Sequence, residues 1–333
     1  MPRRGIEGAQ LNEGRQLVHV WIVDENGSPW AELFEFAHRP AGAEKDIGPN
    51  EESPMTSVRS VVDAAGELSG TFSGRLLRPA DIGYEEARKV HNGLVDKRPA
   101  LIARCQGVAD VVDAINLTRK LGLEVAVRGG GHNVAGRATI DGGLVIDLSP
   151  MKGIHVDPNS RTARAQGGVT WAELNRETQL HGLAVTGGVV SSTGIAGLTL
   201  GGGLGWLMSK YGLALDNLLS VELVTAEGKV VKTSKDKEPD LFWAVRGGGG
   251  NFGVATSFEY QLHAVGPTVT AGLIAHPFDS ARDLLKFFRD STASLPDEHT
   301  IFGTLTHAPD GSGTKVAAMA TCHCGSLEAG EKA

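Results

Sequence analysis

The chain has 333 residues, enough for two domains with a large buried core. Its charged fraction of 21% and hydrophobic fraction of 41% are ordinary for a globular protein, and no apolar run approaches the roughly 20 residues of a membrane helix. The net charge of −7 argues against a nucleic-acid partner, because phosphate contacts require a dense basic face. We therefore expect small-molecule chemistry, with neither nucleic acid nor membrane as a partner.

The first ten residues, MPRRGIEGAQ, carry arginines without the apolar stretch of a secretory signal. The three cysteines, Cys105, Cys322 and Cys324, are an odd number at spacings that predict neither a disulfide framework nor a zinc knuckle. Both observations favour a cytoplasmic location. The unusual count is glycine, at 45 residues, about twice the average share. Because the glycines are clustered, we expect the backbone to approach a ligand closely.

Residues 1–54 are rich in Pro, Gly and charge and lack a sustained hydrophobic period, so we interpret them as a poorly ordered extension. Globular patterning begins at Met55, where SVRSVVDAAGEL has helical spacing. YEEARKVHNGL, residues 84–94, predicts a second short helix, with acidic residues early and Lys89 late, as the helix dipole favours.

The next stretch predicts a βαβ unit. ALIARC indicates a buried strand with Cys105 in the core, a helical apolar face follows as far as Gly122, and LEVAVR alternates as a second strand. The glycine run 129–131 therefore lies in a loop at the carboxyl end of a parallel strand. Ligands bind at that edge of open α/β sheets.

The stretches GLVIDLS and RTARAQG predict further strands after the glycine run, where a dinucleotide-binding Rossmann unit would have a helix. A dinucleotide fingerprint is formally present as Gly248, Gly250 and Gly253, but it follows a predicted helix and precedes a strand. Since this order is the reverse of the required context, we reject an NAD site.

A helix is predicted from Thr170, which forms a capping box with Glu173. Its Trp171 and Leu174 are expected to face inward, and Gly182 ends it. Residues 186–217 then mix small residues with hydroxyls, a composition typical of backbone that donates N–H groups to phosphates.

Residues 241–262 predict a short helix, a third glycine cluster and a strand. The clusters stop near Gly266, where we place a domain boundary, and a strand and a helix follow it. The tail sequence Cys322, His323, Cys324 contains metal-ligand types, but successive strand residues point to opposite faces. An edge strand is the favoured interpretation, and we expect no metal site.

Five stretches resemble the berberine-bridge-enzyme-like FAD-linked oxidases of the vanillyl-alcohol-oxidase superfamily: VRGGGHN, DGGLVIDLS, GGVVSSTGIAGLTLGGGLGWLMSKYGLALDNLL, LVTAEGK and DLFWAVRGGGGNFGVAT. They occur in the family's order between about Pro99 and Gly266. The resemblance implies an α+β fold. It implies a two-subdomain PCMH-type FAD-binding domain over residues 55–266, followed by an incomplete α+β substrate domain with an antiparallel sheet over residues 267–333.

The resemblance also implies a binding site for FAD, with the flavin attached covalently to His132 through its 8α carbon. The pyrophosphate would lie in the loop of residues 128–133. The implied cofactor-binding residues are Arg128, Gly129, Gly130, Gly131, His132, Asn133, Gly187, Gly188, Ser192, Thr193, Gly194, Gly197, Gly203 and Val254.

Three departures from the family pattern limit what the resemblance implies. Many relatives attach flavin a second time through a cysteine where this chain has Val190, so we expect a single link. Some plant relatives have a catalytic tyrosine at the position of Leu204, so no catalytic base is assigned. The family's closing motifs are missing after GSLEAGEKA, and the sequence looks truncated.

The implied chemistry is hydride removal from an alcohol, sugar or amine carbon by covalently bound FAD, which O2 then reoxidises to give H2O2. The expected partners are a small-molecule substrate and O2. Two alternatives stay open: a flavin dehydrogenase that uses another electron acceptor, and an inactive flavin-binding fragment.

Overall fold

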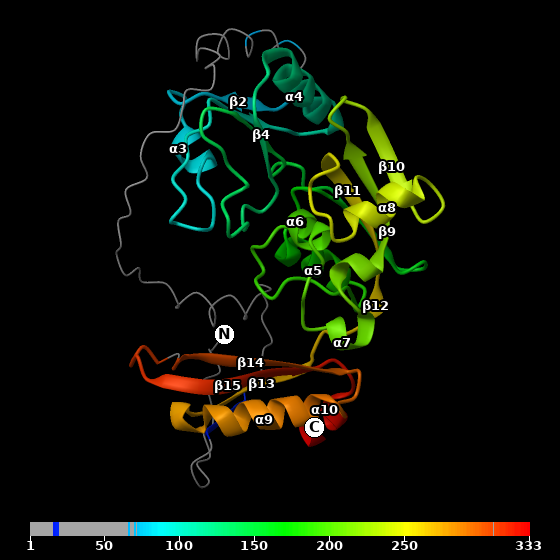
Figure 1. Ribbon diagram of the computed structural model, residues 1–333. Coiled ribbons are helices and arrows are strands. Elements are labelled where there is room, and N and C mark those ends of the chain that lie inside the picture. The colour runs from blue at the N-terminus through cyan, green and yellow to red at the C-terminus, as the bar shows by residue number, and fades with distance from the viewer. Residues whose placement is uncertain (1–15, 20–65, 67–69, 71, 309) are drawn as a thin grey trace, which may run out of the picture.

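The computed structural model describes residues 16–19, 66, 70, 72–308 and 310–333, and its elements form an α+β fold (Figure 1). Three sheets of four, five and four strands and one two-stranded pair make up the β structure. The predicted helix after Met55 lies outside the described residues, except for Gly66. The predicted extension, residues 1–54, also lies outside them except for strand β1 (Gln16–His19).

The first sheet has the order β2 (Arg75–Leu77), β3 (Leu101–Arg104), β5 (Leu144–Asp147), β4 (Val125–Arg128). Strand β5 lies between β3 and β4 and is parallel to both, so the predicted parallel unit is confirmed with one strand inserted. Helix α4 (Val108–Leu121) packs on it through a cluster that includes Val111, and Gly122 ends the helix with a left-handed φ of 63°. Cys105 is fully buried, as predicted.

The second sheet is antiparallel throughout, in the order β10 (Val230–Ser234), β9 (Leu218–Val224), β11 (Val254–Gln261), β7 (Thr162–Gln166), β6 (Ile154–Asp157). Its core contains Phe258 and Tyr260 together with residues of helices α5 (Trp171–Gln179) and α6 (Ile195–Leu200). Short elements complete this part of the molecule: β8 (Leu183–Ala184), α7 (Met208–Tyr211), η1 (Ala214–Asn217), α8 (Pro239–Val245) and β12 (His263–Ala264).

Helix α5 begins as the sequence predicts. Thr170 is its N-cap, and the backbone N–H and the hydroxyl of Thr170 both donate to the Glu173 carboxylate, at 2.8 and 2.9 Å. Trp171 and Leu174 are fully buried. The helix itself ends at Gln179, and the chain turns at Gly182, where φ is 62°.

The predicted helix over residues 84–94 is mostly wrong. Only α3 (Tyr84–Ala87) is helical, and the chain leaves the helix after Arg88. The physical reason is tertiary: the backbone N–H of His91 and the side chain of Asn92 donate to carbonyls of the loop that follows β4. These bonds replace the local bonds that would have continued the helix.

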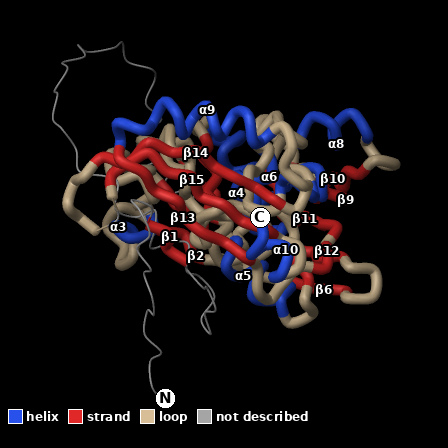
Figure 2. The backbone as a smooth tube through the Cα atoms, turned by 90° about the horizontal axis from the view of Figure 1, so that it is seen from below, coloured by secondary structure: helices blue, strands red, loops and turns tan. Residues whose placement is uncertain are grey.

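The third sheet has the order β1, β13 (Thr270–Pro277), β15 (Lys315–His323), β14 (His299–His307). Helices α9 (Ala281–Thr292) and α10 (Leu327–Lys332) lie on one of its faces (Figure 1 and Figure 2), and η2 (Phe278–Ser280) directly precedes α9. The predicted edge strand around Cys322 is wrong, because β15 pairs on both sides, with β13 and β14. A strand's position in its sheet depends on pairing with strands that are distant in the sequence, and the local residue pattern does not indicate these partners.

The capping box of α5 provides a test of local stability. Thr170→Ala removes the side-chain half of the box, and we expect it to lower the free energy of unfolding by about 1 kcal/mol in urea denaturation. Thr170→Ser keeps the hydroxyl and should stay within about 0.5 kcal/mol of the parent chain. Equal stabilities of the alanine and serine variants would contradict this role.

Candidate functional site

Two glycine-rich loops meet at the carboxyl end of β4. A methyl group built on Gly130 would lie 2.2 Å from the backbone nitrogen of Gly194, and one built on Gly194 would lie 2.4 Å from the nitrogen of Gly130. No side chain fits at such distances. The structure therefore brings the predicted stretches 128–133 and 186–203 into direct backbone contact, and glycine at these two positions serves that contact.

The backbone N–H groups of residues 129–133 form an unpaired row. Within the part of the chain that the structure describes, none of these five groups donates a hydrogen bond to a protein acceptor. The carbonyls are different: Gly131 accepts from the backbone N–H of His91 at 3.1 Å, and Val134 accepts from Asn92 Nδ2 at 2.8 Å. Gly131 has a left-handed φ of 73°, a conformation found in backbone nests that bind anions.

Arg128 stands at the start of this row of N–H groups. Its Nη1 donates to the carbonyl of Ala87, while its Nε is buried and finds no acceptor among the described residues. A buried N–H of a guanidinium group is costly without an acceptor. The donor set of Arg128 and residues 129–133 is therefore suited to an anionic ligand.

His132 is held on three sides. Its Nε2 lies 3.1 Å from the hydroxyl of Ser192, and its Nδ1 lies 3.3 Å from the hydroxyl of Thr193. The ring of His91 stacks on it, with 4.0 Å between centroids and 13° between planes. Burial and the nearby His91 lower the pKa of His132 to about 4. The imidazole is thus neutral at pH 7, with a proton on one ring nitrogen and a lone pair on the other, and each of these nitrogens faces a hydroxyl.

The other predicted glycines are explained in part by packing. A methyl group at Gly187 would collide with the indole of Trp171, and one at Gly188 would collide with the side chain of Leu198 and crowd the same indole. A methyl group at Gly203, where φ is 92°, would collide with the side chain of Ala214. These glycines let the 186–203 segment lie flat on α5 and η1. Gly197 differs, because a methyl group there meets no described atom within 4 Å.

The remaining predicted positions have structural partners of their own. Asn133 Oδ1 accepts from the backbone N–H of Arg137 at 3.0 Å and so closes a turn of its own chain. Val254 is buried at the start of β11, opposite Val224.

Two positions differ from the family pattern. Val190, where many relatives have a second flavin-linking cysteine, carries no thiol. Leu204, where some plant relatives have a tyrosine, is 61% exposed.

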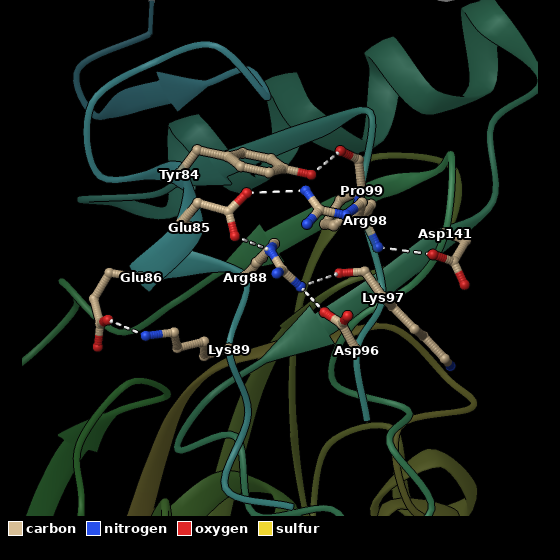
Figure 3. Close-up of polar contacts among 10 residues, drawn as sticks. All are labelled: Tyr84, Glu85, Glu86, Arg88, Lys89, Asp96, Lys97, Arg98, Pro99 and Asp141. Carbon is tan, nitrogen blue, oxygen red and sulfur yellow. Dashed lines mark hydrogen bonds and ion pairs between the residues drawn. The ribbon is translucent and has the colours of Figure 1, made fainter. Parts of the chain in front are cut away.

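Sequence reasoning missed the segment of residues 87–97, which we name the clip. It holds the glycine loop through Ala87, His91 and Asn92, and Lys97 Nζ reaches the carbonyl of Gly136 at 3.2 Å. A dense polar network anchors the clip to α3 (Figure 3). The sequence signal at these residues was helical periodicity, which gave no indication of a partner about 40 residues further along.

The comparisons with known proteins agree with this geometry. A family model described as an FAD binding domain matches residues 99–234. The chain is 39% identical over 264 residues to (R)-6-hydroxynicotine oxidase of Paenarthrobacter nicotinovorans, an alignment that covers 79% of this chain and 57% of that protein. The solved structure of 6-hydroxy-D-nicotine oxidase from Arthrobacter nicotinovorans matches with a TM-score of 0.74 and 38% identity, over 79% of this chain and 58% of the other. The structure of a berberine-bridge-enzyme-like protein of Physcomitrella patens matches with a TM-score of 0.72 and 26% identity, over 82% of this chain and 57% of the other.

The chain contains an FAD binding domain and is similar, over most of its length, to berberine-bridge-enzyme-like FAD-linked oxidoreductases. The predicted resemblance and the α+β fold are both confirmed. The chain spans 57% of the length of the nicotine oxidase and 54% of an FAD-linked oxidoreductase of Dictyostelium discoideum, to which it is 34% identical over 246 residues. In the described ranges, no helix is long and apolar enough to cross a membrane. The same ranges contain no cluster of three or more His, Cys, Asp or Glu residues arranged to hold a metal.

The residues present fit the cofactor of this FAD-linked family. FAD contains a diphosphate, and the five unpaired N–H groups together with the unpaired Nε of Arg128 are donors without acceptors of their own. The neutral imidazole of His132 lies at the end of the same loop. Anion donors and a nucleophilic nitrogen are therefore within one stretch of six residues.

The contact between the two glycine loops can be tested directly. Gly130→Ala forces one of the loops to move, and we expect it to lower the free energy of unfolding by about 1–3 kcal/mol and to weaken FAD binding at least about tenfold. The matched control is Gly93→Ala, because a methyl group there meets no described atom within 4 Å. Urea denaturation and FAD titration measure the two effects. Unchanged FAD affinity in Gly130→Ala would contradict the need for this contact.

Proposed function

We propose that this protein is an FAD-dependent oxidase that removes a hydride from an alcohol, sugar or amine carbon. The observation that carries the proposal is the row of five unpaired N–H groups that ends beside the neutral His132. The names of similar proteins support it: one is an (R)-6-hydroxynicotine oxidase, and a variant of Phl p 4 is named a glucose oxidase. A location in the cytoplasm stays a prediction.

In this proposal residues 55–266 form the FAD-binding domain, and residues 267–333 begin a substrate domain. Arg128 and the N–H groups of residues 129–133 would hold the diphosphate. The proposed contacts along the rest of the cofactor are Gly187, Gly188, Ser192, Thr193, Gly194, Gly197, Gly203 and Val254. When bound, FAD supplies a two-electron acceptor for the substrate hydride and passes the electrons to O2, which becomes H2O2.

We also propose that His132 attaches FAD covalently. An imidazole nitrogen would form a bond to the 8α methyl carbon, which would lose one hydrogen while the imidazole would lose its N–H proton. The flavin and the imidazole together would give up two electrons and two protons, and O2 would take these up as H2O2. The low pKa of His132 supports this step, because only the neutral imidazole has the required lone pair. Since Val190 provides no thiol, the link would be single.

A flavin dehydrogenase is the second candidate. The wild-type Phl p 4 protein, 28% identical to this chain, is described as a glucose dehydrogenase. The two candidates differ in the electron acceptor and not in the cofactor site. Stopped-flow reoxidation of the reduced protein in air separates them: reoxidation within seconds supports the oxidase, whereas reoxidation over minutes supports the dehydrogenase.

The covalent link predicts a clear difference on denaturation. The parent chain loaded with FAD should stay yellow after acid precipitation and show the added mass of one FAD. His132→Ala should release all of its flavin, while it still binds FAD through the N–H groups of the same loop. His155→Ala on β6, an exposed histidine, is the control and should retain the link. Complete release of flavin from the parent chain would exclude covalent attachment.

The pKa of His132 predicts an unusual pH dependence of flavin attachment. A lowered pKa keeps the imidazole neutral as the pH falls, so the rate of attachment should change less than about twofold between pH 8 and pH 5 and fall only near pH 4. An unshifted histidine with a pKa of ~6.5 would slow the reaction about thirtyfold at pH 5. The time course of covalent incorporation at each pH distinguishes the two cases. Slowing that begins at pH 6.5 would contradict the lowered pKa.

A further inference from the structure

The clip carries one aromatic ring to the attachment histidine. His91 lies on the surface, yet its ring is stacked almost parallel on His132, with 4.0 Å between centroids and 13° between planes. Its backbone N–H donates to the carbonyl of Gly131, the residue before His132. One residue therefore contacts both the backbone and the side chain at this point of the loop.

The clip holds His91 firmly. Figure 3 shows that Arg88 bonds to both Glu85 and Asp96, at the two ends of the segment that includes His91. Arg98 Nη1 donates to Glu85 at 2.9 Å. Both carboxylates, Glu85 and Asp96, are exposed, so each ion pair alone contributes little, and the shared network fixes the clip more than any single pair does.

The contacts of His132 differ in what they restrain. Ser192 and Thr193 meet the edge of its ring, at Nε2 and Nδ1. A hydroxyl rotates easily and can donate or accept, so these bonds alone allow the ring to tilt. His91 covers a face of the ring, and a stacked ring resists tilting.

We propose that His91 is a positioning residue for flavin attachment: its ring supports one face of the His132 imidazole and fixes the plane in which the attacking nitrogen points. The proposal rests on the proposed covalent attachment to His132. The geometry does not suit His91 as a proton acceptor. In nearly parallel rings the nitrogen lone pairs lie in the ring planes, so neither ring directs a lone pair at the other.

The experiment follows flavin attachment in the full chain. Apoprotein of the parent chain, His91→Ala and His91→Phe is produced under riboflavin limitation and mixed with FAD in air. Covalent flavin is then measured over time as visible absorbance of acid-precipitated protein. The affinity for FAD before attachment is measured by flavin fluorescence in the His132→Ala background, so that binding and attachment are separated.

We expect His91→Ala to slow attachment about tenfold, the effect of losing one aromatic stack. Its affinity for FAD should stay within about twofold, because the backbone N–H that holds Gly131 remains. His91→Phe keeps a ring in the stack and should restore most of the rate. This rescue distinguishes a stacking role from a proton-accepting role, which phenylalanine cannot perform.

Two results would overturn the proposal. One is attachment by His91→Ala at the rate of the parent chain, and the other is failure of His91→Phe to exceed His91→Ala. If His91→Ala loses FAD affinity to the same extent as attachment rate, His91 only supports the loop, which also contradicts a positioning role. Absence of a covalent link in the parent chain is a separate outcome, since it removes the proposed attachment itself.

Discussion

The close approach of Gly130 and Gly194 is the constraint on which the rest of the site depends. It joins the loop that ends a parallel strand of the first sheet to the loop that begins helix α6 on the second. Because the backbones touch, Ser192 and Thr193 reach both nitrogens of His132. The same contact leaves the N–H groups of residues 129–133 without protein acceptors. The packing between the two loops and the proposed binding of an anion thus involve the same glycines.

The clip completes this arrangement from the other side. Its residues donate hydrogen bonds to the carbonyl groups of Gly131, Val134 and Gly136. The N–H groups of residues 129–133 stay without an acceptor among the described residues. It also places His91 on His132, which contributes with burial to the low pKa of His132. An imidazole that is neutral, stacked and hydrogen-bonded at both nitrogens is held in one orientation, which suits the proposed bond to FAD.

The sequence predicted what local patterns determine. The capping box at Thr170, the stop at Gly122 and the strand before Arg128 all depend on neighbouring residues, and all are present. The family motifs predicted a cofactor site at the glycine loop and His132, and this role stays a prediction. What the sequence did not predict depends on contacts between distant residues. The backbone of Gly130 meets that of Gly194, 64 residues away, and the ring stacked on His132 belongs to His91, 41 residues away.

Two errors have the same physical origin. The helical pattern at residues 84–94 yields to tertiary hydrogen bonds made by His91 and Asn92, which exceed the weak preference of a short isolated helix. The strand that contains Cys322, β15, is interior because it pairs with β13 on one side and with β14 on the other. Strand β13 is separated from β15 in the sequence by α9 and β14. Pairing of this kind is fixed by the assembled core.

Hydrogen exchange at the backbone N–H groups of residues 129–133 tests the central claim most directly. The FAD-free chain should exchange these five N–H groups rapidly, because none has a protein acceptor among the described residues. Binding of FAD should slow all five, while the N–H groups of β6, on the far edge of the second sheet, stay unchanged. Saturating FAD that left residues 129–133 as fast as before would show that this row does not hold the diphosphate.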